Sequence, residues 1–195
     1  MSAKQKKRNS IIQSALKLFS SKGFYNTTIS EISEQMGISV GNVYNYFPSK
    51  KSLAQASIRY VTGKLAIELR YINHLKISQK DKIRRFVEIY LKFVQEYPEM
   101  IEYFFKVYLS NRELFCDKDD CGFALAKEFI DEVEALVEKG VTEGEFVKID
   151  FYIAFSLIAG VLGSMTFLNS EKVLANDLDI YIDDITSLIY KGLAK

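Results

Sequence analysis

The chain has 195 residues, 48% of them hydrophobic, and a formal net charge of +1. That length suits one compact body or a small domain joined to a larger one. Two prolines, no tryptophan and no Gly/Ser-rich tract exclude a linker-rich chain, and the recurrence of Leu, Ile, Lys and Glu favours helices over sheet.

The near-neutral total hides a charge asymmetry along the chain. Residues 1–60 hold nine of the 26 Lys and Arg residues and two of the 25 acidic residues, a net charge of +7, which leaves −6 for the remainder. A basic end on an acidic body is typical of a head that binds a polyanion. A near-neutral isoelectric point therefore does not exclude DNA as a partner.

Targeting signals and cysteines indicate the compartment. The apolar pair Ile11 and Ile12 is followed at once by polar residues, so no signal peptide is predicted. Cys116 and Cys121 are too few for a disulfide framework, and we expect a cytoplasmic protein. The Cys-x4-Cys pair lacks further ligands, since the only histidine, His74, lies elsewhere. Ordinary loop cysteines are the interpretation, with a redox or metal role left open; no cofactor and no metal site are expected.

Hydrophobic spacing and capping residues predict two helices early in the chain. One apolar stripe runs through residues 9–22 and stops at Gly23. Thr28 and Glu31 have the spacing of a capping box, which predicts the start of a second helix over residues 29–36.

A third short helix follows directly. Gly37 is suited to the left-handed conformation that closes a helix, and Ser39 is a good N-cap for residues 40–47. Pro48 disfavours continuation of that helix. Two helices of about two turns joined by a short glycine-containing turn are the outline of a helix-turn-helix.

The remainder of the chain predicts six more helices and no convincing strand. We expect an all-α protein of about nine helices, with a DNA-binding domain at residues 1–50 and a second helical domain at residues 51–195. The later helices are expected at 49–72, 78–98, 99–109, 129–140, 151–168 and 178–189, with a loop at 111–122 and a turn at 142–148.

Residues 28–53, with parts of residues 9–27, resemble the N-terminal signature of the TetR (tetracycline repressor-like) family. The matching parts include the Thr-capped helix, the Gly-Ile-Ser turn, the Gly-Asn-Val-Tyr helix and the Ser-Lys that precedes Leu53. Ser33, Met36 and Tyr46 depart from the usual alanines and histidine without breaking the pattern. The resemblance covers residues 9–60 and implies a three-helix helix-turn-helix domain followed by a helical ligand-binding and dimerisation domain. It also implies a ligand-released repressor that binds palindromic operator DNA as a homodimer.

The third helix has the properties of a recognition helix. Its polar side chains are short and include no carboxylate, so phosphates would not be repelled. Thr28, at a helix N-terminus, is expected to bind a phosphate, with Tyr44, Tyr46 and Lys50 clamping the DNA backbone. The basic residues 4–8 either contact phosphates or form a solvated tail. The predicted DNA-binding residues are Thr28, Ser39, Val40, Gly41, Asn42, Tyr44, Asn45, Tyr46 and Lys50.

A dimer needs an apolar seam, and the uncharged residues 151–168 together with residues 178–189 supply a candidate. A membrane-spanning interpretation of the first segment is weakened by its serines, threonine and glycines and by the absence of a basic flank. The predicted interface residues are Ala154, Leu157, Ile158, Val161, Leu162, Met165, Tyr181, Ile185 and Leu188.

Aromatic residues are abundant between residues 60 and 129, more than a core of this size needs. Some of these side chains could therefore line an apolar pocket, and we hypothesise a small hydrophobic or aromatic effector that separates the heads through the fourth helix. The candidate ligand-binding residues are Tyr60, Phe86, Tyr90, Phe93, Tyr103, Phe104, Tyr108 and Phe129.

Two other classes of function have less support in the sequence. An enzyme is not expected, because the chain has one histidine, no Gly-rich phosphate loop and no recognisable nucleophile or metal pair. A helical adaptor that has lost DNA binding is the other alternative, and the intact head argues against it.

Overall fold

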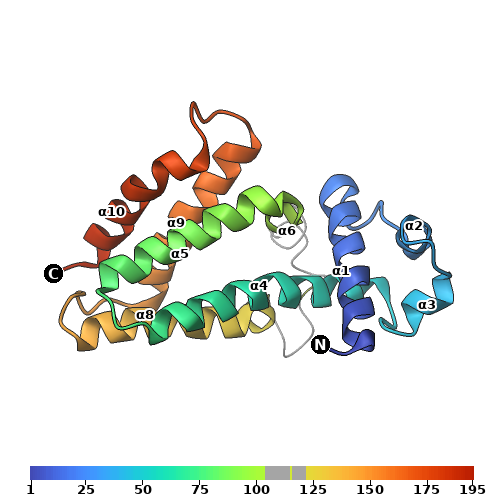
Figure 1. Ribbon diagram of the computed structural model, residues 1–195, viewed down its shortest axis with the longest axis horizontal. Coiled ribbons are helices and arrows are strands. Elements are labelled where there is room, and N and C mark those ends of the chain that lie inside the picture. The colour runs from blue at the N-terminus through green and yellow to red at the C-terminus, as the bar shows by residue number, and fades with distance from the viewer. Residues whose placement is uncertain (104–114, 116–121) are drawn as a thin grey trace. The chain divides into compact units, whose positions relative to one another are not determined.

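The computed structural model describes residues 1–103, 115 and 122–195, and these residues form two compact units. Within the described ranges the chain has nine α-helices and two 3-10 helices. Figure 1 shows how the helices follow one another along the chain. The β-type contact recorded there is a single bridge between Phe146 and Ala194. The expected all-α class is thus confirmed, whereas the predicted domain boundary at residue 50 stays a prediction.

The first unit comprises residues 1–63 and 98–127. Its core forms where α1 packs against α6 and α2. Phe19 stacks on Tyr103 with ring centroids 5.6 Å apart, and the Tyr103 hydroxyl donates to the carbonyl of Ala54 at 2.9 Å. The unit contains α1 (Ala3–Lys22), α2 (Ile29–Gln35), α3 (Val40–Tyr44), the first part of α4 (Lys50–His74), α6 (Pro98–Tyr103) and η2 (Gly122–Ala126).

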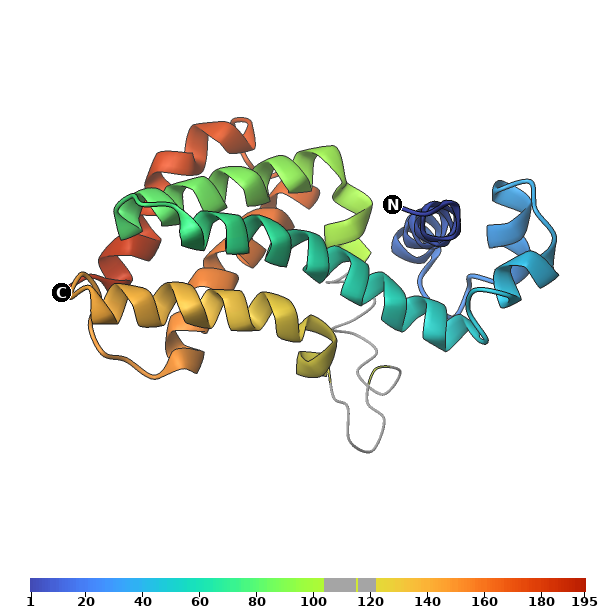
Figure 2. The same cartoon turned by 60° about the horizontal axis from the view of Figure 1, so that its bottom comes forward.

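The second unit comprises residues 64–97 and 128–195. In it α5, α9 and α10 pack on one another, as the two views in Figures 1 and 2 show. The C-terminal part of α4 is joined to α8 by an ion pair between Arg70 and Glu132 at 2.6 Å. The unit contains the remainder of α4, α5 (Gln79–Glu96), α8 (Lys127–Thr142), α9 (Phe151–Ser170), η3 (Leu178–Tyr181) and α10 (Ile182–Leu193).

Local capping accounts for where the predicted helices begin. Thr28, Ser39 and Ser78 each accept a hydrogen bond from the backbone amide three residues later, and Thr28 and Glu31 form the full capping box. Each bond satisfies an amide that has no partner inside its helix. The caps predicted at Thr28 and Ser39 are confirmed, and Ser78 caps α5 in the same way.

Several helices differ in extent from the sequence-based expectation. The last, expected at 178–189, consists of η3 followed by α10, which ends at Leu193. The first begins at Ala3 rather than residue 9, because Ser2 caps it by accepting from the Gln5 amide. The third is assigned only to Val40–Tyr44, although the amide of Phe47 still donates to the carbonyl of Val43. The sixth is described to Tyr103, so the rest of its predicted range lies outside the described residues, as do Cys116 and Cys121.

Candidate nucleic-acid interface

Helix α3 buries one side in the head and leaves the other open to solvent. Val43 is fully buried and Phe47, just beyond the helix, is 2% exposed, so these two side chains anchor the segment. The structure gathers the predicted reading residues on the opposite side. Ser39, Val40, Gly41, Asn42, Tyr44 and Asn45 are exposed, and Tyr46 is half-buried.

The exposed side of α3 has the chemistry that reading of base edges requires. Its polar residues are short, and a carboxylate is absent from residues 39–46. Gly41 has no atom within 4 Å of the place where a Cβ would stand, so the backbone is open to close approach there. Asn42 and Asn45 can hydrogen-bond bases or phosphates, and Val40 can contact a thymine methyl group.

The N-terminus of α2 is held by the carboxylate of Glu31, which the sequence predicts as a member of the capping box and which has a second partner in the structure. Glu31 accepts from the Thr28 amide at 2.8 Å and from the Thr28 hydroxyl at 3.0 Å. Its other oxygen pairs with the Lys22 ammonium at 2.7 Å. Hydrogen bonds from Lys22 and then from Thr28 lower the pKa of Glu31 to about 2. The donors expected to bind a phosphate at Thr28 are therefore shared with Glu31 in the free protein.

Lys50 has a different environment from the one expected of a phosphate clamp. Its ammonium donates to the carbonyls of Phe24 at 2.9 Å and Thr27 at 2.8 Å, and to that of Tyr25 at 3.4 Å. It also lies 4.4 Å from the centre of the Phe24 ring. Burial lowers the pKa of Lys50, an effect that the negative charge of Glu31 partly offsets. Spacing alone does not show this contact, because the turn lies more than 20 residues earlier in the chain.

The basic residues near the N-terminus lie on the first turns of α1 instead of forming an extended tail. Lys4 and Lys6 are exposed, and the guanidinium of Arg8 lies 5.0 Å from the centre of the Phe47 ring. Arg8 therefore packs on the residue that follows α3. The exposed lysines add positive charge to the head.

The candidate ligand-binding residues fall into both units. In the first unit Tyr103 is buried against Phe19, and Tyr60 accepts from the Gln13 side chain at 3.1 Å. Both are engaged in packing or hydrogen bonding of that unit, and burial raises the pKa of Tyr103. Phe104 and Tyr108 lie outside the described residues.

In the second unit the predicted aromatic residues cluster around α5. Phe86 lies between Tyr90 and Phe129, with ring centroids 6.3 Å and 6.0 Å away. The Tyr90 hydroxyl is buried and hydrogen-bonded to that of Thr166 at 2.9 Å, and burial raises the pKa of Tyr90 to about 12. Phe86 and Tyr90 are buried in the core and Phe129 is half-buried, and none of the three lines the groove described next.

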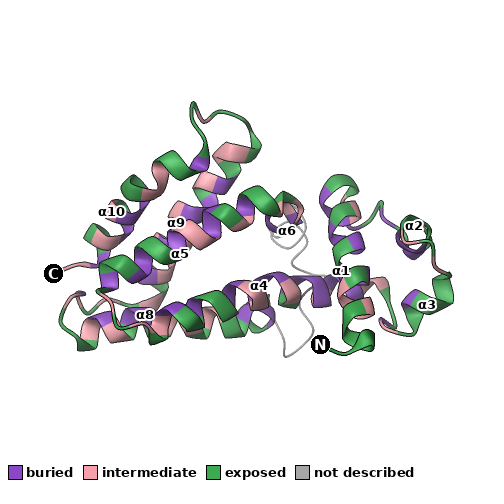
Figure 3. Ribbon diagram, viewed as in Figure 1, coloured by how far each residue is buried: buried purple, intermediate pink, exposed green. Residues whose placement is uncertain are grey.

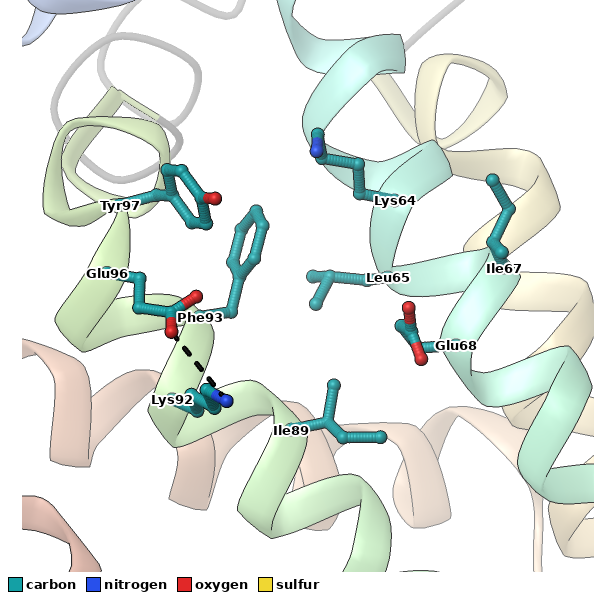
Figure 4. Close-up of a pocket in the computed structure, with 9 residues that line it drawn as sticks. All are labelled: Lys64, Leu65, Ile67, Glu68, Ile89, Lys92, Phe93, Glu96 and Tyr97. Atoms are coloured by element: carbon teal, nitrogen blue, oxygen red, sulfur yellow. Dashed lines mark ion pairs between the residues drawn. The ribbon is translucent and has the colours of Figure 1, made fainter.

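A groove of about 450 Å³ lies between α4 and α5 in the second unit (Figure 4). Of the predicted ligand-binding residues, Phe93 lines it, together with apolar side chains such as Leu65 and Ile89. Glu68 stands on the α4 side, and Glu96 on the α5 side pairs with Lys92 at 3.7 Å. The groove offers an apolar floor with charged groups at its edges.

The predicted dimer seam is divided between the core of the chain and its surface. Ala154, Ile158, Leu162 and Ile185 are buried by the chain itself, so the face that they form is not available to a partner. Leu157, Val161, Met165 and Tyr181 are half-buried, and Leu188 is 56% exposed. Helical periodicity indicates an apolar face but does not say which neighbour covers it.

Other apolar residues of α9 are exposed to solvent. Figure 3 shows how buried, intermediate and exposed residues are distributed along the helices. Ile153 and Phe167 are each 58% exposed, and Gly160 between them has open space at its Cβ position. By length and composition this helix, Phe151–Ser170, could also cross a membrane, and 28% of its apolar stretch is buried in the chain. Core helices of soluble proteins pass the same test, which makes the feature weak evidence for a membrane.

Within the described residues, no cluster of His, Cys, Asp and Glu could hold a metal ion.

In this basic region a capped helix, a glycine turn and a short helix with a polar exposed face follow one another, which is the arrangement of a helix-turn-helix. Residues 11–57 match the family model described as bacterial regulatory proteins, tetR family. The HTH-type transcriptional regulator RutR of Escherichia coli (strain K12) is 29% identical over 149 residues, which cover 74% of this chain and 66% of that regulator. The chain thus matches slightly less than two thirds of that relative's length.

Solved structures match nearly the whole chain. A TetR family transcription regulator from Marinobacter aquaeolei VT8 has a TM-score of 0.83 at 15% identity, over 98% of this chain and 97% of that one. FadR from Bacillus subtilis, solved in complex with stearoyl-CoA, has a TM-score of 0.73 at 15% identity, over 94% and 97%. The fold is therefore TetR-like throughout. Residues 11–57 therefore resemble the head of the tetR family of bacterial regulatory proteins, and the chain shares its fold with these solved structures.

Proposed function

We propose that the protein is a transcriptional regulator that binds palindromic operator DNA as a homodimer and is released by a small effector. The observation that carries this proposal is the exposed, carboxylate-free face of α3, which Val43 and Phe47 anchor within residues 1–60, a region of net charge +7. The residues proposed to contact DNA are Thr28, Ser39, Val40, Gly41, Asn42, Tyr44, Asn45 and Tyr46, with residues 1–50 as the DNA-binding domain. Lys50, the remaining member of the predicted set, is held by backbone carbonyls and is considered separately below. Family resemblance favours repression and a cytoplasmic location.

The proposed effector is a hydrophobic or aromatic molecule that binds within residues 51–195. The groove between α4 and α5 supports this class, because its floor includes Leu65, Ile89 and Phe93. Since α4 also begins at the head, a ligand that fits only one position of this helix would bias the head between two arrangements. The acyl ligand of the FadR neighbour agrees with an apolar effector.

The proposed homodimer uses the open side of α9 with Leu188 of α10. Ile153, Gly160 and Phe167 fall within one face of this helix, opposite the stripe that its own chain covers. The exposed side chains of Ile153 and Phe167 lie on either side of Gly160 along this face. The open glycine between them allows two copies of α9 to cross closely. A dimer also presents two heads to two half-sites of a palindrome.

Retention on DNA tests the proposed function against the adaptor alternative. We expect purified protein to be retained on a mixed-sequence duplex at low salt, with log K falling linearly as log salt rises. Retention that does not respond to salt, or no retention, would favour an adaptor without DNA binding. An enzyme finds no further support, since the matched relatives are named as regulators.

A further inference from the structure

The turn between α1 and α2, residues 23–28, has backbone carbonyl groups that accept no hydrogen bond from the backbone amides of either helix. Those of Phe24, Tyr25 and Thr27 all lie within 3.4 Å of one nitrogen atom, the ammonium of Lys50. On its other side the turn is fastened to α1, because the buried Thr27 hydroxyl donates to the carbonyls of Gly23 at 2.8 Å and Leu18 at 3.2 Å. The turn is thus held from two directions.

The ammonium of Lys50 has no hydrogen left for another acceptor. A lysine ammonium carries three N–H donors, and three carbonyl oxygens meet it here. The ring of Phe24, 4.4 Å away, covers one of its sides, which favours a cation there but hinders a phosphate. A phosphate could accept a hydrogen bond from Lys50 only if at least one of the three bonds from Lys50 to these carbonyls were broken.

Lys50 is also the first residue of α4. The start of that helix is fixed locally, since Ser49 and Ser52 exchange amide-to-hydroxyl hydrogen bonds at 3.1 Å and 3.0 Å. The lysine side chain therefore connects a well-defined helix start to the turn that leads into Thr28. A displacement of the first turn of α4 would move the carbonyls that Lys50 holds.

We propose that Lys50 is a positioning residue that fastens the turn of residues 24–27 to the start of α4, and not a phosphate ligand. Through this contact α4 and the N-terminus of α2 move together, and the turn is ordered before DNA arrives. The DNA part of this proposal rests on the proposed function, whereas the contact itself can be tested in the free protein.

The test compares Lys50→Met with Lys50→Arg, and uses Lys17→Met, an exposed lysine of α1, as the control for charge. Methionine keeps an aliphatic stem but offers no donor. Arginine keeps the charge, but its donors lie in one plane and are spread over three nitrogen atoms, so they do not match three carbonyls that converge on one nitrogen position. Amide hydrogen exchange is measured in the free proteins, and binding to a mixed-sequence duplex is measured across a salt series.

We expect the amides of Thr27 and Thr28 to exchange at least about tenfold faster in both Lys50 variants and unchanged in the control. Binding by Lys50→Met should weaken by about tenfold, because a loosened turn must be ordered on binding. Its salt slope should match that of Lys17→Met. If Lys50→Met does not fold, Lys50→Arg decides by the same exchange measurement.

Two results would overturn the proposal. One is a salt slope for Lys50→Met that is shallower by about 0.9 than that of the control, the signature of a lost phosphate contact. The other is wild-type exchange at Thr27 and Thr28 in both Lys50 variants. Wild-type protein that fails to bind DNA would refute the proposed function instead, and the exchange measurement would still decide the role of Lys50.

Discussion

Replacing Glu31 with glutamine should strengthen DNA binding, although Glu31 stabilises the helix on which the head depends. The Glu31 carboxylate occupies the amide and hydroxyl of Thr28 and neutralises Lys22 at 2.7 Å. Glutamine at this position preserves the capping box, because its side-chain oxygen can still accept from the Thr28 amide. The ion pair is lost, and Lys22 becomes available to a phosphate beside the α2 N-terminus.

The expected size of this effect follows from counterion release. One additional lysine–phosphate contact makes the slope of log K against log salt steeper by about 0.9, which is a further threefold loss of affinity over a fourfold rise in salt. The assay is fluorescence anisotropy of a labelled mixed-sequence duplex over a salt series. Glu34→Gln is the control, since Glu34 is an exposed acid of the same helix. Equal slopes for the two variants, or weaker binding by Glu31→Gln, would refute this account of the α2 N-terminus.

Three further predictions concern the dimer, the core and pH. Gly160→Leu should be monomeric in analytical ultracentrifugation and should keep its stability, since the Cβ position of Gly160 is open. Gly63→Leu, a control at an equally open helical glycine, should stay dimeric. A dimeric Gly160→Leu protein would exclude the proposed seam. The Thr166 hydroxyl donates to the carbonyl of Leu162 at 3.0 Å, so it accepts from the Tyr90 hydroxyl. Tyr90→Phe should therefore reduce the free energy of unfolding by about 1 kcal/mol, and Thr166→Val by about 1–3 kcal/mol, because only Thr166→Val leaves a buried hydroxyl without its acceptor. Denaturant titration showing the reverse order would contradict this. The pKa of Glu31 is lowered from 4.5 to about 2, so the stabilising contribution of its carboxylate is present above pH 4.5 and is lost as the pH falls towards 2. Between pH 4.5 and pH 2 the wild-type protein should therefore lose stability relative to Glu31→Gln. Above pH 4.5 the stability difference between the two proteins should not change.

Local features of this chain were predictable because their causes lie within a few residues. The caps at Thr28, Ser39 and Ser78 each join a side chain to an amide three residues later, and the structure has all three. Glycine and proline mark the ends of the short helices for similarly local reasons. The head could therefore be placed on the sequence to within a few residues.

Contacts between distant segments were not predictable in the same way. Lys50 reaches a turn more than 20 residues earlier, and charge and position alone made it resemble a phosphate ligand. In α9 the periodicity indicated apolar faces, but only the fold shows that Ala154 and Ile158 are covered by the chain while Ile153 is not. Which residues of α9 stay exposed to solvent depends on the helices that pack against it, and the hydrophobic periodicity of α9 does not identify those helices.

Selection of bound fragments from a pool of random duplexes by the purified, full-length protein tests the central claim most directly. The account predicts enrichment of an inverted repeat whose half-sites are spaced by about one helical turn, 10 bp, or a multiple of it, with base preferences lost when Asn42 or Asn45 is replaced by alanine. A selected pool without an inverted repeat, or one that keeps its base preferences in both variants, would contradict the assignment of α3 as the reading helix of a dimeric regulator.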